Sequence, residues 1–180
     1  MKQLLPIAFI AALAACNSEP EVDVRNARPG DVAKQVAEAR GTDSFVRPGK
    51  WQTSFKLEEM TMPGMPPQVA EQMKAQMNVT DTSESCLTEA DVRKPREDFF
   101  AGANRNCTYD HFTMAGGTID AEMTCKDGGA TMNMTVKGTY SPDSYTARST
   151  MTASGTGPNG GGMTMKSTIA AKRVGECDAR

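Results

Sequence analysis

Hydrophobic and polar residues alternate strictly along two neighbouring stretches, residues 131–140 and 144–151. In each stretch every second side chain is apolar or small, and the side chains between them are threonine, asparagine, lysine or arginine. A period of two predicts strands with one dry face and one wet face. Ser141-Pro142-Asp143 has turn chemistry, because proline presets φ and aspartate can bond to the local backbone. The region therefore predicts a β-hairpin in an antiparallel sheet half exposed to water.

The same alternation predicts strands elsewhere in the chain. They are a strand at 51–57, a short strand at 82–87, a second hairpin at 106–125 that turns at Gly116-Gly117, and a last strand at 163–174. In the second hairpin, Phe112 and Met114 are out of phase with Cys107. We therefore expect a bulge or two-sided burial there, with Tyr109 and His111 on the face of Cys107.

About seven strands, mostly neighbours in sequence, indicate a mainly β fold. The economical arrangement is an antiparallel meander that forms a curved sheet, a half-barrel or a small open barrel. Strands and long helices do not alternate, which argues against a parallel α/β sheet. One or two short helices are expected: an amphipathic helix at 67–78 after the Met- and Pro-rich break at 60–67, and a helical turn at 88–94 that begins with a capping box.

The N-terminus has the pattern of a bacterial export signal. A short basic segment precedes an apolar run from Leu4 to Ala15, which is too short to span a bilayer. Leu13-Ala14-Ala15-Cys16 resembles a lipobox, so residues 1–15 are predicted to be a lipoprotein signal peptide and Cys16 the lipidated residue. The alternative is an ordinary secretory signal. Asn17, rather than aspartate, favours an outer-membrane lipoprotein that faces the periplasm.

Residues 16–44 are polar and carry two prolines, which predicts a flexible, disordered tether before a β-sheet domain at 45–180. Within the tether, residues 31–40 have a weak helical pattern. Such a short helix would be marginal by itself.

Composition limits the size of the core, since 38% of residues are hydrophobic and 6% aromatic. The 13 methionines must supply part of the dry face, with Trp51 as its anchor. The formal net charge of -2, without a basic block, argues against a nucleic-acid partner.

Four cysteines remain once Cys16 is set aside, and an exported protein sits in an oxidising compartment, which predicts two disulfides. Pairing the strands about Gly116 places Cys107 opposite Cys125. Cys86–Cys177 follows by elimination. With no Cys-x-x-Cys spacing and one histidine, a zinc site is not expected.

Several short motifs together resemble a bacterial family known as domain of unknown function 3617. The motifs are Arg47-Pro48-Gly49-Lys50-Trp51, Met62-Pro63-Gly64-Met65-Pro66, Cys86-Leu87-Thr88, the two cysteines at 107 and 125, and Gly175-Glu176-Cys177. The resemblance covers about residues 46–177. It implies an exported protein, often a lipoprotein, and no catalytic residues, since the family has no established activity.

Catalytic chemistry is not indicated. His111, with Asp110 or Asp120 nearby in sequence, lacks the Gly-x-Ser-x-Gly elbow of a serine hydrolase. The glycine-rich segment 155–162 lacks the Gly-Lys-Ser/Thr ending of a phosphate loop, so it is expected to be a connector.

The leading hypothesis is a non-enzymatic, cofactor-free binding or structural module, joined to the membrane by its lipid. Its partner would be an envelope protein or an apolar or acyl ligand held on a methionine-rich sheet face. The alternative is a periplasmic Cu(I)-binding protein, because thioethers suit Cu(I) and Met60, Met62 and Met65 are closely spaced.

Overall fold

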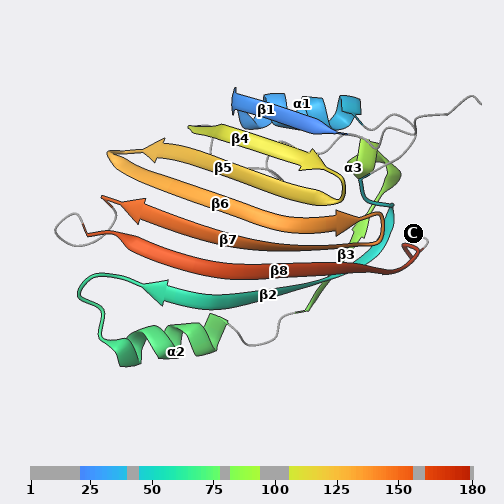
Figure 1. The fold of residues 1–180 in the computed structure, drawn as a ribbon. Coiled ribbons are helices and arrows are strands. Elements are labelled where there is room, and N and C mark those ends of the chain that lie inside the picture. The colour runs from blue at the N-terminus through green and yellow to red at the C-terminus, as the bar shows by residue number, and fades with distance from the viewer. Residues whose placement is uncertain (1–20, 40–44, 78–81, 94–105, 156–160, 179–180) are drawn as a thin grey trace, which may run out of the picture.

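The computed structural model describes residues 21–39, 45–77, 82–93, 106–155 and 161–178. Within these ranges, eight strands form one antiparallel sheet and three short helices accompany it (Figure 1). The elements are β1 (Val22–Ala27), α1 (Pro29–Ala39), β2 (Gly49–Thr61), α2 (Pro67–Met77), β3 (Ser83–Leu87), α3 (Glu89–Arg93), β4 (Cys107–Ala115), β5 (Thr118–Asp127), β6 (Ala130–Ser141), β7 (Ser144–Ser154) and β8 (Met163–Gly175).

Strand order across the sheet is β1-β4-β5-β6-β7-β8-β2-β3. Strands β4 to β8 form a meander, while the chain crosses from β1 at one edge to β2 near the other. The edge strands β1 and β3 do not pair, so the sheet is open (Figure 1). The predicted mainly β antiparallel fold is confirmed, with eight strands in place of seven.

The eighth strand, β1, lies in the segment that the sequence assigned to a tether. Within 16–44, the structure describes residues 21–39 as β1 and α1, so a flexible tether is not found there. The weak helical pattern at 31–40 corresponds to α1. β1 pairs with β4 and buries Val22 and Val24, and α1 buries Val32 and Val36 in the same core. Two valines in six residues are a weak local signal, and only pairing with the distant β4 makes them a strand.

A bulge at Asp110 sets the faces of β4. The register of β4 against β5 shifts between Tyr109 and His111. Phe112, 1% exposed, therefore joins Tyr109 in the core, and their rings meet edge to face at 5.4 Å. The expected bulge is confirmed, but His111 lies on the opposite face from Tyr109.

The other predicted elements are found close to their expected bounds. β2 continues through Met60 to Thr61 after an irregularity near Glu58, so the strand ends later than expected. The capping box of α3 is reciprocal. The Thr88 amide donates to Asp91 at 3.0 Å, and the Asp91 amide donates to Oγ1 of Thr88 at 3.2 Å.

Both predicted disulfides are present. Cys107 and Cys125 are register partners on β4 and β5 with a Cα–Cα distance of 4.0 Å. Cys86 on β3 joins Cys177, beyond the end of β8, with a Cα–Cα distance of 5.5 Å. The second bridge fixes the edge strand β3 to the C-terminal end of the domain.

Candidate functional site

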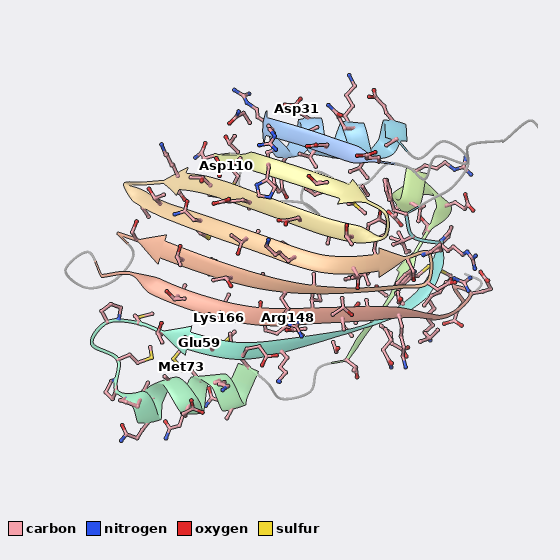
Figure 2. All side chains as sticks on the ribbon, viewed as in Figure 1. Asp31, Glu59, Met73, Asp110, Arg148 and Lys166 are labelled. Carbon is pink, nitrogen blue, oxygen red and sulfur yellow. A yellow bond between two sulfur atoms is a disulfide. The ribbon has the colours of Figure 1, made fainter. Side chains whose placement is uncertain are left out.

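The two faces of the sheet differ sharply in chemistry. One, here called the apolar face, carries the alternate residues of β6 and β7 that include Met134, Val136, Ala147 and Met151. The other, here called the polar face, carries threonines and charged residues. On it Lys166 of β8 donates to Glu59 of β2 at 2.6 Å, with Arg148 of β7 nearby (Figure 2).

A continuous line of methionines crosses the apolar face. Register partners run from β5 to β2, one residue from each of five adjacent strands, in the order Met123, Met134, Met151, Met165 and Met60. We call this the methionine row. Adjacent strands are about 4.8 Å apart, so the row extends about 19 Å across the sheet.

Rows on either side extend the apolar surface. One flanking row holds the Cys107–Cys125 disulfide, Met132, Ala153 and Met163. The row on the other side contains a polar pair, Ser149 and Ser167, whose hydroxyls lie 2.7 Å apart. Each hydroxyl thus has a hydrogen-bond partner within an otherwise apolar surface, which lowers the cost of placing it there.

Burial of the apolar face changes from one side of the sheet to the other. Under α1, the β4–β5 end is closed, and Met123 is 2% exposed. On β6, β7, β8 and β2, the methionines of the row are half-buried, and Phe55 is 42% exposed. Of the described helices, α1 packs mainly on β1 and β4, whereas α2 lies mainly beside β2 and has no buried residue. An apolar surface of this kind, beside a closed core, is a candidate binding surface.

The row reaches a groove between β2 and α2 at its open end. The groove has a volume of about 320 Å³ and contains Met60, Met62 and Met65 together with Glu58, Glu59, Glu71 and Lys74. Met73 lies on the side of α2 toward the sheet (Figure 2). A second hollow of about 450 Å³ is lined by Met62, Ala153 and Met163 among others. It shares Met62 with the groove between β2 and α2, so the two hollows adjoin. The structure thus brings the three methionines of the Cu(I) hypothesis to one groove.

His111 lies on the polar face within a charged group. Its Nε2 is 3.0 Å from Oδ1 of Asp120, and its Nδ1 is 3.8 Å from Oε2 of Glu122. Lys137 donates to the other Asp120 oxygen at 2.9 Å. Hydrogen bonds from His111 and then Lys137 hold the pKa of Asp120 below its ordinary value. Asp110 instead accepts from Thr124 at 2.9 Å, away from this group.

The part of the chain that the structure describes contains no cluster of three His, Cys, Asp or Glu residues suited to a metal ion. Within the same residues, no helix is long and apolar enough to cross a membrane. Cys16 and the signal segment 1–15 lie outside the described residues, as does most of the glycine-rich segment 155–162.

The motif Arg47-Pro48-Gly49-Lys50-Trp51 at the start of the domain has a structural role. Trp51, 4% exposed, donates its indole N–H to the carbonyl of Arg47 at 3.0 Å. The Arg47 guanidinium in turn contacts Asp143 in the β6–β7 turn at 3.1 Å. Trp51 also packs against Tyr145, with ring centroids 6.0 Å apart. The motif therefore fastens β2 to the β6–β7 hairpin, which confirms Trp51 as a core anchor.

The end of β8 completes the same fastening. Nε of Arg173 donates to the carbonyl of Pro48 at 2.7 Å, and the Arg173 guanidinium forms an ion pair with Glu176. These contacts account for the motifs at both ends of the domain.

The model of the family described as "Protein of unknown function (DUF3617)" matches residues 46–177.

The chain belongs to the DUF3617 family. The match confirms the resemblance in the sequence and spans β2 to β8, while β1 and α1 precede it. Comparison with curated proteins and with solved structures gave no match. Family membership therefore assigns no activity.

Sequence reasoning identified most of these residues but not their arrangement. It placed Met132, Met134, Met163 and Met165 on dry faces of separate strands. The methionine row appears only when the β5–β6, β6–β7, β7–β8 and β2–β8 registers are known. The β2–β8 pairing joins residues more than a hundred positions apart, and a local pattern cannot predict such a register.

Proposed function

We propose that this DUF3617 member is a non-enzymatic binding module of the cell envelope, and that it holds a lipid acyl chain along the methionine row. The observation that carries the proposal is the half-buried, continuous apolar surface from Met134 to Met60, which starts at a closed core and ends in a groove. Ligand sites are mostly apolar with a few polar groups, as here with the Ser149–Ser167 pair.

Shape and side-chain chemistry favour an acyl chain over a compact ligand. The open part of the row, from Met134 to Met60, crosses four strands and is about 14 Å long, which suits a segment of an extended hydrocarbon chain. Methionine is unbranched and polarizable, so it adapts to chains that differ in length or unsaturation. Each buried CH₂ contributes about 0.8 kcal/mol, so even partial burial of a long chain gives useful affinity.

The cellular setting is part of the proposal. We propose that residues 1–15 are removed, that Cys16 carries the lipid anchor, and that the domain faces the periplasm from the outer membrane. The lipobox Leu13-Ala14-Ala15-Cys16 and the residue Asn17 support this. Intact-mass measurement of the exported protein tests it, since a diacylated Cys16 adds the mass of its acyl chains and Cys16→Ser abolishes the addition.

Native mass spectrometry of the Cys16→Ser protein, exported to the periplasm and purified without detergent, tests acyl binding. We expect a retained lipid mass of several hundred daltons. A titration with a fluorescent fatty acid then compares Met151→Glu, on the row, with Thr152→Glu, its neighbour on the opposite face of β7. Binding should be lost in the first variant and kept in the second. A bare protein mass together with no binding of the fatty acid would favour a structural or protein-binding role.

Cu(I) binding is the second candidate, because Met60, Met62 and Met65 share one groove. It predicts a one-copper adduct in the same mass spectra and its loss in the triple variant Met60→Ala, Met62→Ala and Met65→Ala. The matched control is Met132→Ala with Met163→Ala, on the flanking row. Unchanged copper affinity in the triple variant removes this candidate.

A further inference from the structure

The methionine row also has the properties of an oxidation site. Directly opposed residues on paired strands have Cβ atoms about 4.5–5.5 Å apart, so each thioether of the row has another as its cross-strand neighbour. A chemical change at one sulfur therefore alters the surroundings of the next. Leucine has a similar volume but no sulfur, so it could not undergo this change.

Access to the sulfurs is graded along the row. Met123 is 2% exposed beneath α1, whereas Met134, Met151, Met165 and Met60 are half-buried on the open side. An aqueous oxidant can reach the four open positions before Met123. Met123 therefore serves as a buried control for the four more accessible methionines of the same row.

Thiols do not compete for the oxidant in the described residues. Cys86, Cys177, Cys107 and Cys125 are all held in disulfides. Thiolates are the usual first targets of oxidants, and methionine is the next sulfur available. The open methionines are consequently the softest nucleophiles on this surface.

We propose that Met60, Met134, Met151 and Met165 are sites of reversible sulfoxidation by hypohalous acids, and that their oxidation releases the bound acyl chain. The release step rests on the proposed function, whereas the sulfoxidation does not. Hypochlorous acid transfers Cl⁺ to the thioether sulfur, which donates the electron pair. Water then adds to sulfur, chloride leaves, two protons pass to solvent and hydroxide, and the products are sulfoxide, chloride and one net proton.

Oxidation would change the chemistry of the apolar face. A sulfoxide is polar, and burying its oxygen under a hydrocarbon without a hydrogen bond costs free energy. Several adjacent sulfoxides would make the row favour water over an acyl chain. The product is a substrate for thiol-dependent methionine sulfoxide reduction, a class of reaction that restores the thioether and with it the apolar surface.

The test treats the folded Cys16→Ser protein with substoichiometric hypochlorous acid and maps sulfoxides by peptide mass spectrometry. We expect oxidation at the four open positions and sparing of Met123. Sulfoxides confined to Met77, which is 44% exposed on α2, and to the loop methionines would overturn the site assignment. This readout does not require a ligand.

Release is tested with the fluorescent fatty acid on the same oxidised protein. Affinity should fall on the order of tenfold or more, since several apolar contacts become polar. The variant Met60→Leu, Met134→Leu, Met151→Leu, Met165→Leu has no oxidisable sulfur at the four positions, so its own affinity for the fatty acid should be the same before and after treatment with the oxidant. Met77→Leu, the matched control off the row, should remain sensitive. Unchanged affinity in a protein that is oxidised along the row would overturn the release step.

Discussion

The guanidinium of Arg173 occupies the space that a side chain at position 49 would need. A Cβ built on Gly49 would lie 2.5 Å from Nε of Arg173 and 2.5 Å from the carbonyl oxygen of Gly175. Gly49 also has a φ of 142°, which other residues rarely adopt. The glycine of the family motif therefore lets Arg173 cross β2 to reach the Pro48 carbonyl.

Gly49→Ala should destabilise the domain strongly, because it adds both backbone strain and a clash with Arg173. Backbone strain alone costs about 1–3 kcal/mol. Denaturant unfolding measures the loss, with Gly175→Ala as the control, since a Cβ there meets nothing within 4 Å. Equal stabilities of the two variants would contradict the steric argument.

Removal of each disulfide in turn should lower the free energy of unfolding by unequal amounts. In the chain-entropy model, closing the Cys86–Cys177 loop, with a sequence separation of 91, contributes about 4.6 kcal/mol. The Cys107–Cys125 loop, with a separation of 18, contributes about 3.2 kcal/mol. Double alanine variants of each pair, compared by denaturant unfolding, should show the larger loss for the longer loop. The reverse order would mean that packing around the buried Cys107–Cys125 pair outweighs loop entropy.

Acid should remove the contribution of the Asp120 carboxylate to the stability of the folded domain. Its pKa is held below 3.8 by hydrogen bonds from His111 and Lys137, so the folded state binds the proton less readily than the unfolded chain. This stabilisation is present above pH 3.8 and is lost as pH falls through the lowered pKa. Wild type should be more stable than Asp120→Asn at neutral pH, and the difference should shrink in acid. A difference that stays constant into strong acid would exclude this linkage.

Alkali should destabilise the core through Tyr109. Burial raises the pKa of Tyr109 to about 12 from an ordinary value of 10.0, so the unfolded chain loses the phenolic proton first. The stability linked to the neutral phenol is complete below pH 10 and declines as the pH approaches about 12. Unfolding free energies across this range should fall less steeply for Tyr109→Phe. Parallel profiles for the two proteins would contradict this role of Tyr109.

Local pattern predicted much of the fold, because most pairings join strands that follow one another in sequence. The β6–β7 hairpin turns at Pro142 and Asp143 as expected, and Gly116-Gly117 closes the β4–β5 hairpin. The two disulfides followed from the same reasoning, since the hairpin register places Cys107 opposite Cys125.

Features set by distant contacts were not predictable. A bulge or two-sided burial was expected in the β4–β5 hairpin, but the position of the bulge at Asp110 was not. This bulge turns His111 outward and Phe112 into the core. β1 becomes a strand only through β4, and the full methionine row exists only through the β2–β8 register. Alternation within a strand specifies which residues share a face, and it does not specify which strand lies alongside.

Strand β1 also changes how far the domain can stand from a membrane. A tether of residues 16–44 would give a long reach, but β1 begins at Val22. With Cys16 lipidated as proposed, only residues 17–21 separate the anchor from the sheet, and fully extended they span at most about 20 Å. The β1 edge would then be held next to the bilayer, with the β2–α2 edge on the opposite side of the sheet. The domain would then stay close to the membrane instead of extending into the periplasm. It could exchange lipid only with the membrane itself or with molecules at the membrane surface.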